Sequence, residues 1–288
     1  MLQVGSENSR PIYLHYEDLG KGKPVILLHG WPLNHQSWEL QVPELVARGH
    51  RVITYCRRGF GQSSKPSTGY DYDTLAEDLH KLITHLDLRE VTLVGFSMGT
   101  GEVARYLSTY GDERISRAVF ISGILPALLK DDDNPEGIDG KIFDEMIREI
   151  KQDRFAFMQK FFNDFYGHGL INISEVSNAV KDFSWSVACQ ASPIATVNCV
   201  ESWYEDFRND ISKIKVPCLV IHGSGDKITP LKNTGLRLKQ MLPRCRYVEL
   251  EGAPHGLIVS HAQEVNARLV DFLRPEALRH EESALIPH

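Results

Sequence analysis

Three shortages in the sequence each exclude a class of protein or partner. No apolar stretch approaches the roughly 20 residues that a membrane-spanning helix needs, so we expect no membrane partner. Basic residues are outnumbered, with 32 Lys and Arg against 38 Asp and Glu, and the net charge is −6. No stripe of basic residues is present to neutralise phosphates, so we do not expect a nucleic-acid partner either.

Cysteine is also scarce. The chain has five cysteines, which is an odd number, and no two of them form a C-x-x-C pair. We therefore expect free thiols rather than structural disulfides or a zinc site. Residues 1–8 lack a basic segment followed by an apolar one, so the sequence predicts no secretory signal and a cytoplasmic location.

Short apolar runs alternate along the chain with patterns typical of amphipathic helices. Near-continuous apolar strands belong to parallel sheets that are covered on both faces. The alternation therefore predicts an α/β protein with a mostly parallel, doubly wound sheet and right-handed crossovers. The six expected strands are Val25–Leu28, Val52–Tyr55, Val91–Val94, Ala118–Ile121, Cys218–Ile221 and Tyr247–Leu250.

Three helices are marked by apolar residues that recur on one face. The first covers Leu75–Leu86, and Thr74 with Glu77 predicts a capping box at its start. The second covers Val103–Tyr110, and the third covers Val265–Leu273 just before a proline. These helices are expected to lie between the strands and to cover the sheet.

The alternation breaks between about residues 124 and 215, where strand signals vanish and aromatic residues gather in helical patterns. We interpret this segment as a helical cap inserted between two strands. The core then comprises 1–123 and 216–275, the cap 124–215, and a polar tail, expected to be mobile, 276–288. The cap aromatics have two interpretations that stay open here: they form the cap's own core, or they line a substrate pocket.

The pentapeptide Gly95-Phe96-Ser97-Met98-Gly99 lies between an apolar strand pattern and a helical pattern. In that setting G-x-S-x-G predicts a nucleophile elbow, a sharp turn that exposes the serine hydroxyl. Such a turn crowds the positions two before and two after the serine, which suits residues without a Cβ. We therefore expect Ser97 to be a nucleophile.

A serine nucleophile needs a base, and the base needs an acid that orients it. Asp226 and His255 each follow a later predicted strand, and catalytic groups in a doubly wound sheet lie at the carboxyl ends of its strands. The chain order Ser, Asp, His is that of elbow hydrolases. Alone, each residue has an ordinary interpretation in a turn. Together, in this order and setting, they predict a catalytic triad.

Seven other histidines lack a position at a strand end. We expect them to be solvated or to fill packing roles rather than to act as the base. They are His15, His35, His50, His80, His85, His168 and His261.

Acyl transfer also needs two N–H donors for the oxyanion. We expect one from the backbone of Met98 and the other from Trp31, where Gly30 permits a close approach and Pro32 has no N–H to donate. The Trp31 indole is a candidate wall of the substrate pocket. The further candidates for pocket residues are Phe96, Phe162 and Trp203.

These residues resemble the α/β-hydrolase superfamily and, more narrowly, its cofactor-free bacterial haloperoxidase and arylesterase family, also called perhydrolases. The resemblance extends from about Ile12 to Leu273. It implies the triad Ser97, Asp226 and His255, with Trp31 and Met98 as oxyanion donors. The matching segments are His29–Leu33, Arg57–Ser64, Val94–Gly99, Gly101–Tyr106, the loop of Asp226, and Ala253–Gly256.

The resemblance implies hydrolysis of short-chain and aryl esters without metal or haem. It also implies perhydrolysis, which the family associates with a proline at the position of Pro32: hydrogen peroxide replaces water and yields a peracid, which oxidises halide outside the protein. The sequence departs from the family at Cys56, where Asp is usual, and at Thr100, where Gly is common. The loss of the Asp puts the support of the following loop in doubt.

Two alternatives stay open from the sequence. Related members cleave lactones or γ-lactams, so a lactonase or γ-lactamase with the same triad is one of them. A non-catalytic ligand receptor on a hydrolase fold is the more remote one. The expected partners are a small-molecule ester and water or hydrogen peroxide, and a homo-oligomeric state stays open.

Overall fold

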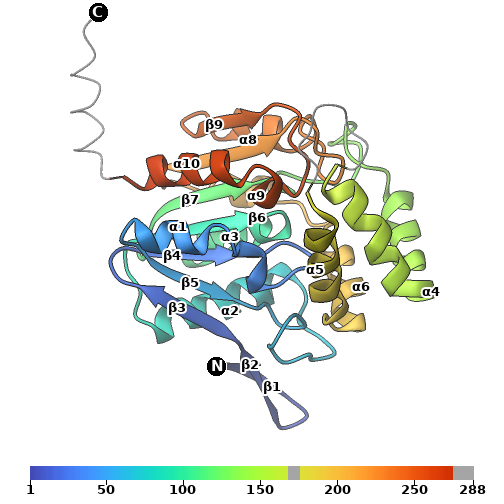
Figure 1. Cartoon of the computed structure of the whole chain (residues 1–288), viewed down its shortest axis with the longest axis horizontal. Helices are drawn as coiled ribbons and strands as arrows, with labels where there is room; N and C mark the ends of the chain where they lie inside the picture. Colours follow the sequence, from blue (N-terminus) through green and yellow to red (C-terminus); the bar gives the residue numbers. More distant parts are fainter. Residues whose placement is uncertain (168–175, 275–288) are drawn as a thin grey trace, which may run out of the picture.

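The computed structural model describes residues 1–167 and 176–274, which build a sheet of seven strands covered by helices (Figure 1). The strand order is β3-β5-β4-β6-β7-β8-β9. Only the β3–β5 pair is antiparallel within this sheet, and the other five neighbouring pairs are parallel. The strands are β3 Tyr16–Gly20, β4 Pro24–Leu28, β5 Arg51–Tyr55, β6 Val91–Phe96, β7 Ile115–Ile121, β8 Cys218–Gly223 and β9 Arg246–Leu250.

Each of the six strands predicted from the sequence is present. The central strands β4 and β6 are buried at every position, which is why their sequences are almost entirely apolar, with Thr92 of β6 as the one polar side chain. Leu28 pairs with Gly95, and Val94 pairs with Val119, so β4, β6 and β7 end close to one another at the same edge of the sheet.

The sequence did not predict the N-terminal strands. Strands β1 (Leu2–Glu7) and β2 (Arg10–Leu14) form a separate hairpin, and β3 is the antiparallel edge of the main sheet. Four of the five residues of β3 are exposed. Without a buried apolar run, such an edge strand gives no clear pattern.

Helices α2 (Tyr72–His85), α3 (Met98–Tyr110) and α10 (Ala262–Leu273) agree with the three helices expected. The predicted capping box of α2 is wrong: Asp71 is the N-cap, and its carboxylate accepts the N–H of Thr74 at 2.8 Å. An Asp side chain in this position satisfies a free N–H of the first turn, so Thr74 lies inside the helix. The other helical elements of the core are η1 His35–Trp38, α1 Val42–Ala47, α8 Gly235–Met241 and α9 Leu257–Ser260.

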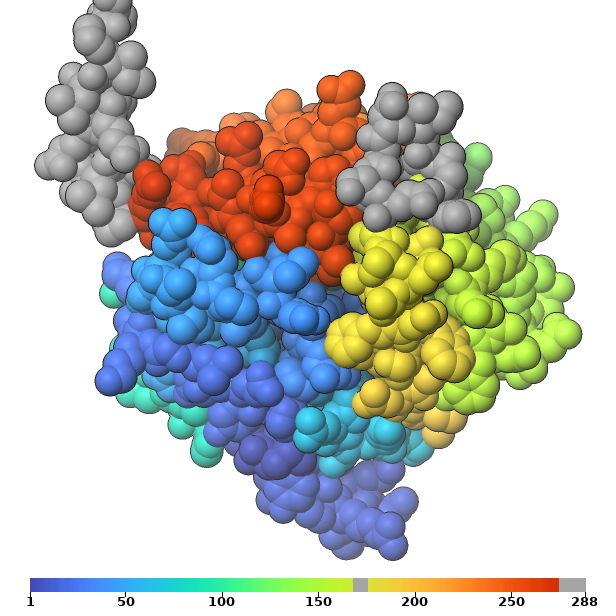
Figure 2. Space-filling view, in the orientation of Figure 1, coloured from blue at the N-terminus to red at the C-terminus, as the bar shows by residue number. Residues whose placement is uncertain are grey.

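Between β7 and β8 the described residues form helices and two isolated β-bridges, Leu129–Ile138 and Asp131–Asn134, but no strand of the sheet. Figure 1 shows α4, α5 and α6 gathered on one side of the sheet, and Figure 2 shows their green and yellow surface packed against the rest of the molecule. These helices are α4 Gly140–Phe165, α5 Asn178–Cys189, α6 Pro193–Ser202 and α7 Arg208–Ile211. We refer to them as the cap helices. The residue limits chosen for core and cap stay a prediction.

The α4 helix is broken at Asp153, whose φ of −153° and ψ of 88° are not helical. Its C-terminal half carries an aromatic cluster of Phe161, Phe162 and Phe165, all of which are buried. Across 1–167 and 176–274, we find no helix with both the length and the apolar character required to span a membrane. The polar tail predicted for 276–288 lies outside the described residues, as does His168.

Candidate active site

Ser97 occupies a strained turn between β6 and α3. Its φ is 53° and its ψ is −121°, a backbone conformation that residues with a side chain rarely adopt. A Cβ on Gly95 would lie 2.6 Å from the Gly99 carbonyl oxygen, and a Cβ on Gly99 would lie 2.5 Å from that of Leu28. Only glycine fits at both positions, as the pentapeptide predicts.

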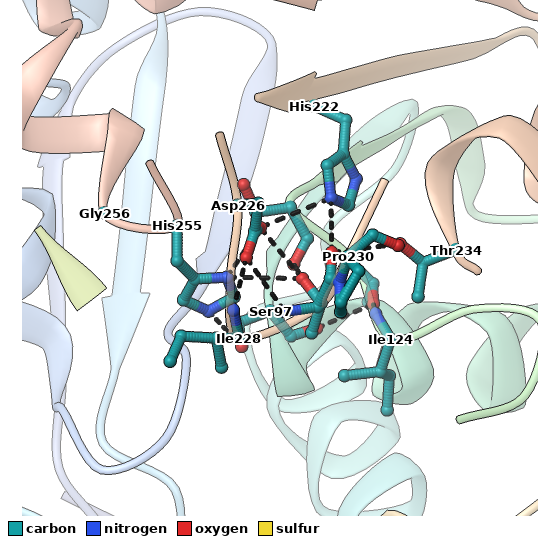
Figure 3. Close-up of polar contacts among 12 residues, drawn as sticks. Ser97, Ile124, His222, Asp226, Ile228, Pro230, Thr234, His255 and Gly256 are labelled. Atoms are coloured by element: carbon teal, nitrogen blue, oxygen red, sulfur yellow. Dashed lines mark hydrogen bonds and ion pairs between the residues drawn. The ribbon is translucent and has the colours of Figure 1, made fainter. Parts of the chain in front are cut away.

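Two loops bring Asp226 and His255 to this turn (Figure 3). Asp226 follows β8, and His255 lies between β9 and α9. The His255 Nε2 is 2.9 Å from the Ser97 Oγ, and its Nδ1 is 2.8 Å from an Asp226 carboxylate oxygen. All three side chains are buried. The arrangement forms one continuous chain of hydrogen bonds, from hydroxyl through imidazole to carboxylate.

His255 is not the only donor to the Asp226 carboxylate. It accepts the backbone N–H groups of Ile228 at 2.9 Å and Thr229 at 2.8 Å, and the Thr229 hydroxyl at 2.9 Å. The His222 Nε2 lies 3.3 Å from the same carboxylate and 2.8 Å from the Thr229 carbonyl oxygen. Burial by itself would raise the pKa of Asp226, but the charge of His255 and hydrogen bonds from both histidines lower it well below its ordinary value.

Thr229 and His222 were not singled out from the sequence. His222 does carry a signal, because it lies one residue before the end of a buried strand and four residues before Asp226. Thr229 has no such signal, since its role depends on the way the loop folds back onto the carboxylate.

The loop after β4 lies directly against the serine. A Cβ on Gly30 would come within 2.9 Å of the Phe96 ring and 3.0 Å of the Ser97 Cβ. Trp31 follows at once, so its backbone is held next to the nucleophile. Met98 is the first residue of α3, where N–H groups have no acceptor within the helix. Both residues expected to donate to an oxyanion therefore flank Ser97.

A buried ion pair supports this loop. The Arg57 Nε donates to the Glu102 carboxylate at 2.8 Å, and its Nη2 donates to the His29 carbonyl oxygen at 2.9 Å. The Tyr55 hydroxyl also donates to Glu102. The Arg57 backbone N–H donates to the His29 Nε2 at 3.0 Å. Burial, helped by the charge of Arg57, holds the pKa of His29 well below its ordinary value, so the ring is neutral.

The loop that follows Cys56 does not depend on a carboxylate at that position. Arg58 forms a bidentate ion pair with Asp78, with hydrogen bonds of 2.7 and 2.8 Å. The Ser63 hydroxyl donates to the Cys56 carbonyl oxygen at 2.6 Å. The loop is therefore fixed at both ends, which answers the doubt raised by the missing Asp. Thr100, the second departure, accepts the N–H of Ile124 at 3.2 Å and so links α3 to the loop after β7.

A cavity of about 550 Å³ opens onto Ser97 beneath the cap helices. Its walls are largely apolar, with lysines and carboxylates near the cap. The lining residues include Ile124, Leu128, Ile138, Phe143, Met146, Phe157, Phe161, Trp203, Ile228 and Pro230, with Lys141, Glu145, Glu149, Lys160, Asp164 and Lys227 among the charged ones.

Of the four residues expected to line a pocket, Trp203 belongs to this cavity wall. The other three side chains are not among the residues that line this cavity and are buried in packing contacts. Phe96 packs on the His255 ring, with centroids 5.3 Å apart. Phe162 packs on Phe165 at 5.4 Å. The Trp31 ring supports Trp203 edge-on at 5.1 Å.

Among the described residues, the group with the geometry for a metal ion is His15, Glu17 and His35. None of these three residues lies beside Ser97. At the serine, the His255 Nε2 lies 2.9 Å from the hydroxyl, so the residues supply a nucleophile with its own base. The buried hydroxyl, the imidazole and the adjacent N–H groups are suited to attack on a carbonyl carbon.

Comparison with known proteins gives consistent results. A family model described as "alpha/beta hydrolase fold" matches residues 23–262. A protein of Synechocystis sp., provisionally named a non-heme chloroperoxidase, is 50% identical over 94% of this chain and 98% of its own. The crystal structure of a bromoperoxidase from Bacillus anthracis has 44% identity and a TM-score of 0.90, covering 95% of this chain and 98% of that one. A bifunctional esterase/perhydrolase of Acinetobacter calcoaceticus is 30% identical over 91% of this chain and 96% of its own.

Proposed function

Because this hydrolase-fold chain belongs to the cofactor-free haloperoxidase family of α/β hydrolases, we propose that it is a serine hydrolase that cleaves carboxylic esters through an acyl-enzyme. One observation carries the proposal. The His255 ring lies between the Ser97 hydroxyl at 2.9 Å and the Asp226 carboxylate at 2.8 Å, and both contacts are buried. This is the geometry that a serine needs to become a nucleophile at neutral pH.

In the first half of the reaction, the His255 Nε2 takes the proton of the Ser97 hydroxyl as its oxygen attacks the ester carbonyl carbon. The carbonyl oxygen becomes an oxyanion, which the backbone N–H groups of Trp31 and Met98 stabilise. Asp226 keeps the Nδ1 of His255 protonated and stabilises the imidazolium. His255 then gives its proton to the departing alcohol, and the acyl group stays on Ser97.

In the second half, a water molecule attacks the acyl-serine. His255 takes the proton of the water and returns it to Ser97, and the carboxylic acid leaves. When hydrogen peroxide replaces water in this step, the same transfers release a peracid. The relative named as an esterase/perhydrolase supports both routes for this chain.

The cavity favours an apolar ester as the substrate. A volume of about 550 Å³ admits an aryl or short acyl ester with its reacting carbonyl at Ser97. Apolar walls such as Phe161 and Trp203 remove the organic group from water, while the carbonyl stays next to the N–H donors.

The proposal is tested by Ser97→Ala with 4-nitrophenyl acetate as substrate. We expect kcat to fall on the order of 10⁶-fold, because the nucleophile is lost while the rest of the site is intact. Ser108→Ala, in the same helix α3 but away from the turn, is the matched control and should retain the wild-type rate. A Ser97→Ala enzyme as active as the control would remove the proposal.

The same two variants test whether hydrogen peroxide can replace water as the acceptor of the acyl group, and a substrate panel tests which bond is cleaved. With hydrogen peroxide present, peracid formation should require Ser97 to the same extent as hydrolysis does. A panel of an aryl acetate, a γ-lactone and a γ-lactam then ranks kcat/KM. A lactam preferred more than tenfold would replace the ester assignment, and the absence of turnover on the whole panel would favour a ligand receptor.

A further inference from the structure

A second cluster of chemically active side chains lies at the antiparallel edge of the sheet. His15 separates β2 from β3, Glu17 lies in β3, and His35 is the first residue of η1. One donor atom from each of the three lies within 4.8 Å of the other two. We propose that these residues bind one divalent transition-metal ion of the zinc class. The site is independent of the proposed ester hydrolysis.

The spacing of two of the ligands matches a tetrahedral ion. The His35 Nε2 is 3.4 Å from a Glu17 carboxylate oxygen. Two ligands bound to zinc at its usual bond lengths of about 2.0 to 2.2 Å in a tetrahedron are about 3.3 Å apart. Little movement of either side chain is required for both to bind the same ion.

The third ligand has a nitrogen that nothing in the described chain satisfies. The His15 Nε2 is buried and has no hydrogen-bond partner among those residues. Its backbone is fixed on both sides, because its N–H donates to the Ser63 Oγ at 2.9 Å and its carbonyl oxygen accepts the Cys56 N–H at 2.9 Å. A buried nitrogen without a partner is costly, and a metal ion removes that cost. An ion pair between His35 and Glu17 alone leaves this nitrogen unexplained.

His35 is held in the orientation that ligation needs. Its Nδ1 lies 2.9 Å from the Cys56 Sγ, while its Nε2 faces Glu17. A histidine that binds a metal usually engages its other ring nitrogen in a hydrogen bond, which fixes the tautomer and the ring. Cys56, the position where the family usually has Asp, is therefore a support for the ligand rather than a fourth ligand.

The donor set determines the class of ion. Two imidazoles and one carboxylate suit zinc, cobalt and nickel, whereas calcium and magnesium prefer a shell of oxygen atoms. The Glu17 side chain is 45% exposed, so water has access to the fourth position. Since none of the three ligands lines the cavity at Ser97, the ion is expected to join β3 to η1 and to leave ester turnover unchanged.

The test uses the full chain, freed of metal by chelation and dialysis. Calorimetric titration with zinc chloride should show one saturable site per chain, and calcium chloride should show none. At a zinc concentration one hundred times Kd, the Tm should rise by about 5 °C. Cobalt chloride should give visible ligand-field absorption without a thiolate-to-cobalt charge-transfer band, because Cys56 is not a ligand.

Variants locate the ion. Glu17→Gln changes an exposed side chain without a change in shape, and His15→Gln removes the unsatisfied nitrogen; each should weaken zinc binding at least tenfold. His261→Gln is the control for a histidine outside the cluster, and His255→Ala excludes the triad as the binding site; both should bind zinc as the wild type does. Absence of saturable binding, or equal affinity in Glu17→Gln and wild type, would overturn the proposal.

Discussion

Arg57 and Glu102 form an ion pair with both side chains almost completely removed from solvent, 1% and 0% exposed, at a distance of 2.8 Å. The pair connects the end of β5 to α3, the helix that begins at the nucleophile. Because Arg57 also donates to the His29 carbonyl oxygen at 2.9 Å, the same guanidinium fixes the start of the loop that carries Trp31. The support of the proposed oxyanion site is thus a charge pair inside the protein.

Glu102→Gln should be strongly destabilising. The change leaves Arg57 as a buried charge without its counterion, and breaking such a pair costs about 3 to 5 kcal/mol. Urea unfolding measures the difference in free energy. The matched control is Glu44→Gln, which breaks an exposed pair with Arg48 and should cost less than about 0.5 kcal/mol. Equal effects of the two changes would contradict the structural role given to Glu102.

Thr229→Val should lower kcat/KM for an aryl ester about tenfold. The variant keeps the shape of the side chain but removes the hydroxyl that donates to Asp226 at 2.9 Å, and hydrogen bonds to charged groups contribute about 1.5 to 3 kcal/mol. Thr229→Ser retains the hydroxyl and should restore most of the activity. If valine and serine variants are equally active, the hydroxyl does not position the carboxylate.

Gly30→Ala should reduce kcat/KM on the order of 10²-fold, because the new methyl group meets Phe96 and Ser97 at about 3 Å and displaces the loop that carries Trp31. Gly5→Ala is the control: there the nearest atom, of Ile12, is 3.9 Å away. Steady-state kinetics of both variants tests the close approach. An unimpaired Gly30→Ala enzyme would show that the loop is free to move away.

His29 should make folding sensitive to mild acid. Its pKa is depressed by burial, so below pH 6.5 the unfolded chain takes up a proton at this ring and the folded chain does not. Stability from this group is therefore complete above about pH 6.5 and falls by up to about 1.4 kcal/mol per pH unit as the pH decreases. Urea unfolding between pH 5 and 7 measures how the free energy of unfolding changes with pH. This free energy should fall less steeply with decreasing pH in His29→Gln than in the wild type, whatever the stability of the variant at neutral pH.

Much of the fold follows from local sequence patterns. Buried parallel strands are apolar at nearly every position, so β4 and β6 were identifiable from their own residues. The exposed edge strand β3 carries no such pattern, and the cap of α2 depends on Asp71 rather than on the nearby Thr74. The expected α/β-hydrolase fold and family are confirmed by the comparisons.

The site was predictable to the extent that each residue follows a strand. Ser97, Asp226 and His255 share that property, and the structure places them in contact, although their catalytic roles stay a proposal. Residues that only pack against the site do not share a recognisable position after a strand. Phe96 and Phe162 were expected at a pocket because they are aromatic, yet they support other rings, since only the folded chain determines which side of an aromatic residue faces a cavity.

The position of the cap helices has a consequence for how the activity can change during evolution. Ser97, Asp226 and His255 all belong to loops outside 124–215, whereas many cavity walls, such as Phe161 and Trp203, come from within it. Substitutions in that insertion can therefore alter which molecules enter while the reacting groups remain undisturbed. New specificities in this lineage should arise first in the inserted helices.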